Sequence, residues 1–378
     1  MKSMPLNGKT TKRARVLRRP ENSRVLVLGG AGYLGSVLVR QLLDAGRRVR
    51  VLDSFMFGEQ SLDEVKAHPN CELVRGDVRD IGVVVRCMNR CDAVIHLAAI
   101  VGDSACEENE QLAVEVNRAA TRMLTDVAVE CGVGRFIFAS SCSVYGASDS
   151  FVDEQSVVNP LSMYSGMKLD SEQILLRAKS PTFAPTILRL GTLFGLSPRM
   201  RFDLVVNLFV ARAVFMRAII VSNGAQWRPL IHVQDAARAF VAILEAPTES
   251  VAGEMFNVGS LGQNLQIGEL GRAVIRRIPG TRMETLESED RRNYRVAFDK
   301  IQKRLGFQCW KTIDHGIQEI YEAIRAGLIT DFTTAQFNNQ IALRALVRAG
   351  ARQSAPLQLS VKRPAPESGT AKGYAAGI

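Results

Sequence analysis

Residues 24–46 read RVLVLGGAGYLGSVLVRQLLDAG. An apolar run leads into a glycine-rich turn, and apolar residues at helical spacing follow the turn directly. Gly29, Gly32 and Gly35 lie in this turn, where they allow the backbone to bend tightly and to approach a pyrophosphate. The amino terminus of the following helix meets the phosphate charge. The stretch therefore predicts the first strand and helix of a dinucleotide-binding domain.

Apolar runs and helical patterns continue to alternate as far as Gly195. This alternation predicts an α/β protein with a Rossmann-type, doubly wound parallel sheet, whose strands are apolar throughout because helices cover both faces. After Gly195 the rhythm loosens. We therefore expect residues 23–195 to form the dinucleotide-binding domain and residues 196–330 to form a smaller C-terminal α+β substrate lobe, interleaved with the first domain.

The formal net charge of +10 lies at the two ends of the chain. Residues 1–20 carry +7, residues 351–378 carry +3, and the residues between them sum to zero. Because residues 21–350 carry no net charge, they give little evidence for a groove that binds nucleic acid. We interpret residues 1–22 as a basic disordered tail and residues 331–378 as a C-terminal extension that is disordered after about residue 350.

The seven cysteines and four histidines show no spacing that suits a zinc site. We therefore expect no metal site. A chain of 378 residues is large enough to be stable without disulfide bonds, so we also expect reduced cysteines and a cytoplasmic location. The sequence contains no uninterrupted apolar run long enough to span a membrane, and its N-terminal residues lack the apolar stretch of a secretory signal.

Acidic and small residues end the later strands of the predicted sheet. Asp53 closes the second strand eighteen residues after Gly35, where its carboxylate can accept hydrogen bonds from an adenosine ribose. A 2′-phosphate would meet this carboxylate as a like charge, which favours NAD over NADP. Asp77 ends the next strand beside the expected adenine, while Ala98 and Ala99 are small enough for a coenzyme to lie against the sheet.

A strand that ends in the hydroxyl-rich stretch ASSCSVYG precedes a tyrosine and a lysine at helical spacing. Asn159 can cap this helix with Pro160 at its first position, so that Tyr164 and Lys168 share one face. An ammonium near the phenol, together with a positive nicotinamide ring, is expected to lower the tyrosine pKa from about 10. Tyr164 would then accept a proton from a substrate hydroxyl while Ser141 hydrogen-bonds the same oxygen.

These motifs together resemble the extended short-chain dehydrogenase/reductases of the NAD-dependent epimerase/dehydratase family, and the pattern is similar to that of UDP-glucose 4-epimerases. The likeness covers roughly residues 23–328 and includes GGAGYLG, GDV, HLAA, EVNRAAT, SSCSVYG, YSGMK, WRPLIHVQD and FNVGS. It implies that Ser141, Tyr164 and Lys168 are catalytic and that a nucleotide sugar lies between the two domains. It also implies a homodimer, paired through the helix before Tyr164 and the helix that carries it.

The resemblance implies two sets of binding residues. The expected coenzyme residues, besides Tyr164 and Lys168, are Gly29, Gly32, Tyr33, Leu34, Gly35, Asp53, Asp77, Val78, Leu97, Ala98, Ala99 and Asn117. The expected substrate residues are Ser141, Thr192, Asn207, Arg228, Arg292 and Tyr294.

Within the substrate set, Arg228 matches a family arginine that pairs with the substrate diphosphate. Thr192 stands where the epimerases have Asn, which weakens the case for UDP-glucose itself, and Tyr294 falls where they limit the C2 substituent of the sugar. Arg199 and Arg201 remain open between a binding role and solvation.

The residues after the hydroxyl-rich strand distinguish the reactions of this family. The 4,6-dehydratases carry Thr-Asp-Glu there, whereas this chain has Ser141, Cys142 and Ser143, which supply neither the acid nor the base of dehydration. We therefore expect an isomerase, a nucleotide-sugar 4-epimerase that oxidises a hydroxyl to a transient 4-keto intermediate and reduces it again. A ketoreductase or dehydrogenase of the same family is the alternative, and a non-catalytic dinucleotide-binding protein is the third possibility.

Overall fold

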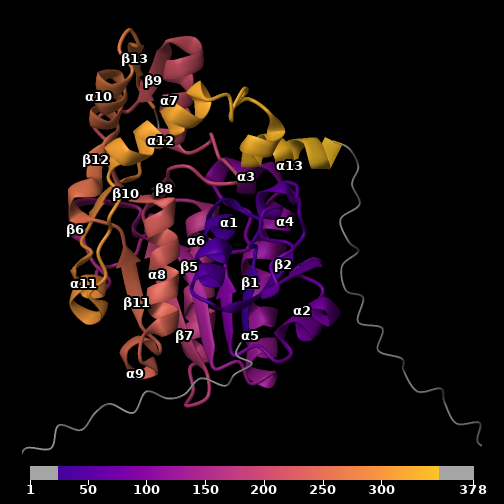
Figure 1. Ribbon diagram of the computed structural model, residues 1–378. Helices are drawn as coiled ribbons and strands as arrows, with labels where there is room; N and C mark the ends of the chain where they lie inside the picture. Colours follow the sequence, from indigo (N-terminus) through magenta and orange to yellow (C-terminus); the bar gives the residue numbers. More distant parts are fainter. Residues whose placement is uncertain (1–23, 289, 349–378) are drawn as a thin grey trace, which may run out of the picture.

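The computed structural model describes residues 24–288 and 290–348. The basic tail expected at 1–22 and the disorder expected after about residue 350 lie outside these described residues. Figure 1 shows a layered α/β body and a smaller lobe above the carboxyl ends of its strands.

Seven strands form the central sheet in the order β11-β7-β5-β4-β1-β2-β3. Every neighbouring pair in this sheet is parallel. The chain runs outward from β1 to β3 on one side and from β4 outward on the other, which is the doubly wound arrangement. The strands are β1 (Arg24–Leu28), β2 (Arg48–Asp53), β3 (Cys71–Arg75), β4 (Ala93–His96), β5 (Arg135–Ser141), β7 (Ala184–Leu190) and β11 (Met255–Val258). The prediction of an α/β parallel sheet is confirmed.

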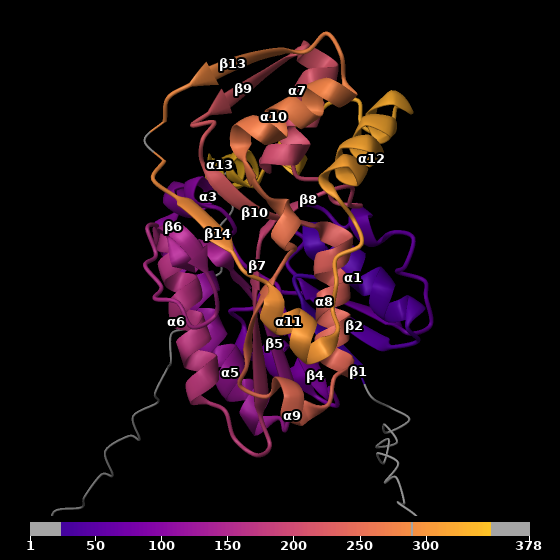
Figure 2. The ribbon, with the colours of Figure 1, turned by 90° about the vertical axis from the view of Figure 1, so that its left-hand side faces the viewer.

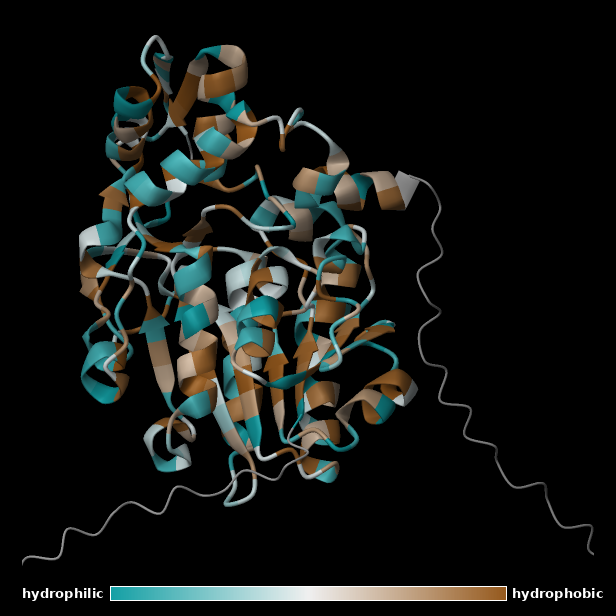
Figure 3. Ribbon diagram, viewed as in Figure 1, coloured by the Kyte–Doolittle hydropathy of each residue, from teal (hydrophilic) through white to brown (hydrophobic). Residues whose placement is uncertain are grey.

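Helices cover both faces of the sheet, and this burial explains its continuously apolar strands, which are brown in Figure 3. One face packs against α1 (Tyr33–Asp44) and α8 (Val233–Glu245). The other packs against α2 (Ile81–Met88), α5 (Ala120–Glu130) and α6 (Met163–Arg177), while α4 (Glu110–Val114) leads into α5 through a π-helical turn at Glu115–Ala119. Two apolar cores therefore sandwich the sheet.

The lobe consists of short strand groups with helices packed over them (Figure 2). Its strands are β8 (Thr192–Phe194), β10 (Trp227–His232) and β12 (Asn264–Gln266) in one group, β9 (Ala218–Ser222) with β13 (Arg282–Leu286), and β6 (Ala147–Val152) with β14 (Asn293–Val296). Its main helices are α7 (Val205–Met216), α10 (Ile267–Arg277) and α12 (Ile313–Arg325). The chain leaves the lobe to add α8 and β11 to the body, so the two parts are interleaved in sequence.

The remaining elements are short. They are α3 (Asp103–Glu108), α9 (Thr248–Val251), α11 (Asp299–Leu305), α13 (Asn339–Arg348) and the 3₁₀ turns Gln60–Leu62, Cys142–Tyr145, Leu261–Gln263 and Ala335–Phe337. Helix α13, in the C-terminal extension, lies beside α3 (Figure 1) and was not expected from the sequence. No helix among the described residues is long and apolar enough to cross a membrane, and all seven cysteines are free.

Helix α6 begins later than the sequence predicts. Ser162, rather than Asn159, is its cap: the Ser162 hydroxyl accepts from the Ser165 amide at 3.3 Å, and the Ser162 amide donates to the Ser165 hydroxyl at 3.1 Å. Asn159 is held elsewhere, because its amide donates to the carbonyl of Val144 at 3.0 Å. The predicted cap was therefore wrong.

A buried ion pair fastens α6 to the sheet. The Arg189 guanidinium on β7 donates to both carboxylate oxygens of Glu172 on α6, with its closest contact at 2.6 Å, and both side chains are almost fully buried. Ser140 at the end of β5 donates to the same carboxylate at 2.5 Å. Arg189 also donates to the Tyr145 hydroxyl at 3.0 Å. Three elements thus meet at one satisfied charge pair.

We predict that Glu172→Ala lowers the free energy of unfolding by about 3–5 kcal/mol, because it leaves the Arg189 charge buried without a partner. Urea denaturation of the purified protein measures this loss. The double variant Glu172→Met, Arg189→Met should recover most of it, and Glu59→Ala, which breaks an exposed pair with Arg75, should change stability far less. A loss from Glu172→Ala no larger than that from Glu59→Ala would contradict the prediction.

Candidate functional site

A cavity of about 540 Å³ lies at the carboxyl ends of the sheet strands, beneath the lobe. This volume falls within the roughly 300–1,000 Å³ typical of small-molecule sites, and the carboxyl edge is where open α/β sheets bind ligands. Eighteen of the expected site residues line it: Gly29, Gly32, Tyr33, Leu34, Gly35, Asp53, Asp77, Val78, Leu97, Ala98, Ala99, Ser141, Tyr164, Lys168, Thr192, Arg228, Arg292 and Tyr294. Asn117 and Asn207 are not among the lining residues.

The glycine-rich turn packs too tightly for side chains. A Cβ on Gly35 would lie 2.2 Å from the carbonyl oxygen of Gly29, so only glycine lets α1 begin this close to β1. Gly29 itself has a φ of +83°, a backbone conformation that glycine adopts without strain. The turn therefore brings the amino terminus of α1 to the cavity, where its backbone N–H groups can hold an anion.

Asp53 holds this turn in place as well as facing the cavity. Its carboxylate accepts from the amides of Ala31 at 2.9 Å and Phe55 at 2.8 Å. Burial raises the pKa of Asp53, and these two amides oppose the rise. Asp77, one strand farther out, forms an ion pair with Arg79 at 2.7 Å.

The two asparagines outside the cavity stabilise its walls. Asn117 accepts from the Ile100 amide and donates to the Ile100 carbonyl, both at 2.8 Å, and so shapes the loop after β4. Asn207 accepts from the Gly195 amide at 3.0 Å and donates to the Tyr33 hydroxyl at 3.1 Å. Both amides are buried and use their hydrogen bonds within the protein.

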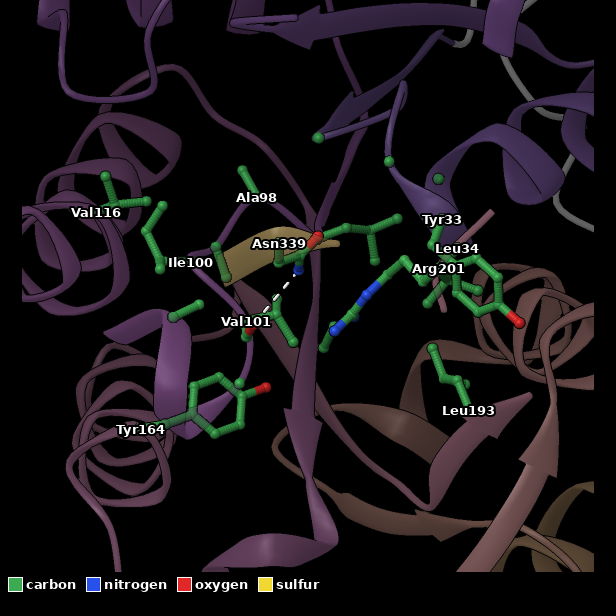
Figure 4. Close-up of a pocket in the computed structure, with 18 of the residues that line it drawn as sticks. Tyr33, Leu34, Ala98, Ile100, Val101, Val116, Tyr164, Leu193, Arg201 and Asn339 are labelled. Carbon is green, nitrogen blue, oxygen red and sulfur yellow. Dashed lines mark hydrogen bonds between the residues drawn. The ribbon is translucent and has the colours of Figure 1, made fainter. Parts of the chain in front are cut away.

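Tyr164 and Lys168 lie on one face of α6, at the end of β5. The Lys168 ammonium donates to the Ala139 carbonyl at 2.7 Å and lies 5.7 Å from the centre of the Tyr164 ring. Figure 4 shows the Tyr164 hydroxyl pointing into the cavity, with Arg201 pointing in from the opposite wall. Ser141 stands at the cavity edge of β5, where its hydroxyl accepts from the Ser143 amide at 3.1 Å.

The other members of the hydroxyl-rich stretch have different partners. Ser140 donates to Glu172, as described above. Cys142 is fully buried, and its thiol donates to the Arg189 carbonyl at 3.2 Å. Burial raises the pKa of this thiol, so Cys142 is a packing residue rather than a nucleophile. Ser140, Ser141 and Ser143 all line the cavity, whereas Cys142 does not.

The expected lowering of the Tyr164 pKa depends on a positive nicotinamide ring as well as on Lys168, and it stays a prediction. Burial of the phenol raises the pKa of Tyr164, and nearby Arg201 only partly opposes the rise. Burial also lowers the pKa of Lys168 to about 8, which weakens the ammonium as a source of positive charge. The protein alone therefore keeps the phenol protonated, and further positive charge is needed to favour the phenolate.

Arginines concentrate on the lobe side of the cavity. Arg228 pairs with Asp290 at 2.9 Å, and Arg292 pairs with Asp290 at 2.7 Å and also with Asp103 across the cleft. Tyr294 lies beneath the Arg228 guanidinium, which is 5.8 Å from the ring centre. Thr192 lines the same part of the cavity. This cluster offers guanidinium groups to an anionic ligand.

Several cavity residues were missed or left open by the sequence analysis. Arg199 and Arg201 are buried in the cavity wall rather than solvated. Residues 338–340 also line the cavity, and Asn339 on α13 donates to the Val101 carbonyl at 3.3 Å (Figure 4). In the sequence, only the basic charge of the two arginines indicated that they could bind an anion. Nothing in the sequence around Asn339 indicated that this residue lies near the glycine-rich turn.

We predict that Tyr164 ionises above pH 10 in the coenzyme-free protein, because burial disfavours the phenolate. Subtracting the ultraviolet pH titration of Tyr164→Phe from that of the wild type isolates this one phenol. Added NAD⁺ should move the midpoint downward, since its positive ring stabilises the nearby anion. A midpoint below pH 10 without coenzyme would show that Lys168 outweighs burial.

Comparisons with known proteins place the chain in a family. Residues 25–259 match the NAD dependent epimerase/dehydratase family. A dTDP-glucose 4,6-dehydratase of Actinoplanes sp. is 28% identical over 80% of this chain and 98% of its own length. A UDP-glucose 4-epimerase of Streptococcus mutans is 31% identical over 66% of this chain and 81% of its own length.

Solved structures show the same architecture. MoeE5 in complex with UDP-glucose and NAD superimposes with a TM-score of 0.71 at 26% identity, covering 81% of this chain and 100% of that protein. The chain belongs to the NAD dependent epimerase/dehydratase family, whose coenzyme is NAD.

Proposed function

We propose that this protein is an NAD-dependent nucleotide-sugar 4-epimerase. The observation that carries the proposal is the convergence of Ser141, Tyr164 and Lys168 on the cavity that also contains the glycine-rich turn. A hydroxyl, a phenol and an amine at the mouth of a dinucleotide site suit the reversible oxidation of an alcohol.

Tyr164 and Ser141 act on one substrate oxygen in this proposal. When bound, NAD supplies a hydride acceptor and afterwards a hydride donor. Tyr164 accepts the proton of the C4 hydroxyl as the C4–H bond breaks, and the hydroxyl becomes a ketone. Ser141 hydrogen-bonds the oxygen in both states, while Lys168 adds positive charge beside the phenolate.

The second half of the reaction reverses these transfers on the opposite face of the sugar. Tyr164 returns its proton to the ketone oxygen as C4 regains a hydride, so no net oxidation occurs. The ketone must turn within the cavity between the two halves, and the diphosphate must stay bound meanwhile. Arg228 and Arg292 are suited to hold it, because guanidinium groups match the geometry of phosphate oxygens.

The local chemistry disfavours 4,6-dehydration, although a 4,6-dehydratase is among the relatives. That reaction needs a carboxylic acid and a carboxylate beside the sugar. Cys142 and Ser143 occupy the corresponding places, and Cys142 is buried away from the cavity. Asp103 and Asp203 do line the cavity, but they form ion pairs with Arg292 and Arg201.

We predict that Tyr164→Phe lowers kcat by about 10²- to 10⁴-fold, because it removes the proton acceptor while keeping the ring. NAD⁺ affinity, measured by calorimetry, should change little by comparison. Tyr321→Phe, outside the cavity lining, provides the matched control and should keep full activity. Full activity in Tyr164→Phe would remove the tyrosine from the mechanism and would favour a dinucleotide-binding protein without catalysis.

The substrate and the net reaction are tested together. The purified protein is incubated with UDP-, GDP-, CDP- and dTDP-sugars, and products are identified by NMR, because epimers share a mass. An epimer formed without added coenzyme, by protein that retains NAD(H) through a desalting column, supports the proposal. Stoichiometric consumption of added NAD⁺ or NADH would instead identify the dehydrogenase or ketoreductase.

We also propose a cytoplasmic homodimer paired through α5 and α6. The family resemblance supports this pairing, and the free cysteines are consistent with a reducing compartment. Analytical ultracentrifugation measures the oligomeric state. A charged substitution at Val129, which is exposed on α5, should weaken the dimer, and an unchanged dimer would move the interface elsewhere.

A further inference from the structure

Among residues 24–288 and 290–348, five arginines line the cavity, and four of them have carboxylate partners. Within the part of the chain that the structure describes, Arg199 forms no ion pair with a carboxylate. The four paired arginines are Arg79 with Asp77 and Glu115, Arg201 with Asp203, Arg228 with Asp290, and Arg292 with Asp290 and Asp103. Arg199 is therefore the exception that requires an explanation.

The surroundings of Arg199 make the missing partner costly. Only 5% of the residue is exposed. Its guanidinium donates to the side-chain oxygen of Asn339 at 2.8 Å and lies 4.0 Å from the centre of the Phe57 ring. Nε is buried without a hydrogen-bond partner among the described residues. Asp53 and Asp203 stabilise this charge, but neither forms an ion pair with it. A buried charge without a close carboxylate is unfavourable unless a ligand supplies the opposite charge.

Hydrogen bonds tie the segment that carries Arg199 to the beginning of α1. The Tyr33 hydroxyl donates to the Gly195 carbonyl at 2.6 Å, and the Ser197 hydroxyl donates to the Tyr33 carbonyl at 2.7 Å. The hydroxyls of Ser36 and Ser197 lie 3.2 Å apart. Gly195 and Ser197 are thus bound to the amino terminus of α1, and Arg199 follows them. The glycine-rich turn brings this same helix terminus to the cavity.

We propose that Arg199 binds the diphosphate of the dinucleotide coenzyme and completes the anion site at the amino terminus of α1. A guanidinium suits this ligand, because it can donate two parallel hydrogen bonds to phosphate oxygens. Asn339 positions the guanidinium from α13, so the C-terminal segment becomes part of the coenzyme site. This inference rests on one part of the proposed function, the binding of a dinucleotide.

Two other phosphates could in principle meet Arg199. The 2′-phosphate of NADP is disfavoured, because the carboxylate of Asp53 lies in the same region and repels it. The diphosphate of a nucleotide sugar is better served by Arg228 and Arg292, which belong to the lobe side of the cavity. The coenzyme diphosphate is the ligand that the position beside α1 favours.

The test is calorimetric titration of wild type and Arg199→Gln with NAD⁺, ADP-ribose, adenosine, NADP⁺ and UDP. The variant should bind NAD⁺ and ADP-ribose about 10- to 100-fold more weakly, which is the usual effect of losing a hydrogen bond to a charged group. Adenosine, which lacks phosphate, should bind equally well to both proteins. UDP affinity should be unchanged, and the ratio of NAD⁺ to NADP⁺ affinity should stay as in the wild type.

Arg47→Gln is the matched control, because Arg47 is also buried but pairs with Glu245 outside the cavity. It should leave NAD⁺ affinity unchanged. Asn339→Ala gives a second route if Arg199→Gln does not fold, and should weaken NAD⁺ and ADP-ribose binding in the same pattern by a smaller factor.

Three outcomes would overturn the inference. They are unchanged NAD⁺ affinity in Arg199→Gln, an equal loss for adenosine, and a loss confined to NADP⁺ or to UDP. Wild-type protein that binds no dinucleotide would contradict the proposed function itself, so the two failures are distinguishable.

Discussion

The ion pair between Arg189 and Glu172 ties the helix that carries Tyr164 and Lys168 to the central sheet. Both charges are buried, so any shift of α6 along β7 that separates them leaves an uncompensated charge in the core. Tyr164, Lys168 and Glu172 follow one another at four-residue spacing on the helix. Holding Glu172 therefore also places the other two side chains at the cavity. Ser140 contributes from β5 by donating to the same carboxylate.

The cavity contains charge that the coenzyme-free protein leaves incompletely balanced. Burial favours the neutral forms of both Tyr164 and Lys168. The buried guanidinium of Arg199 forms no ion pair with a carboxylate among the described residues. A positive ring near Tyr164 and a diphosphate near Arg199 would each improve this balance. The ligand would thus complete the electrostatics of the site, and the acid–base properties of Tyr164 would depend on whether coenzyme is bound.

Local sequence signals predicted much of this arrangement. The glycines of the first turn, Asp53 and the pair Tyr164 and Lys168 were predicted from spacing, because neighbouring residues on a strand or helix have few possible relations. The predicted start of α6 was wrong. Both Asn159 and Ser162 are residue types that can cap a helix, and the hydrogen bond from the Asn159 amide to Val144 leaves Ser162 as the cap. The burial that raises the pKa of Tyr164 in the protein alone could not be predicted either, because spacing does not reveal the extent of burial.

The sequence by itself determined the parallel sheet, the position of the glycine-rich turn and the helical spacing that puts Tyr164 and Lys168 on one face of a helix. Only the tertiary structure decided that Asn117 and Asn207 stabilise the walls, that Arg199 and Arg201 are buried in the cavity, and that α13 reaches it. The physical reason is the range of the interactions. Helix, turn and strand patterns depend on neighbours within a few residues, whereas the contact between Arg199 and Asn339 joins residues 140 positions apart.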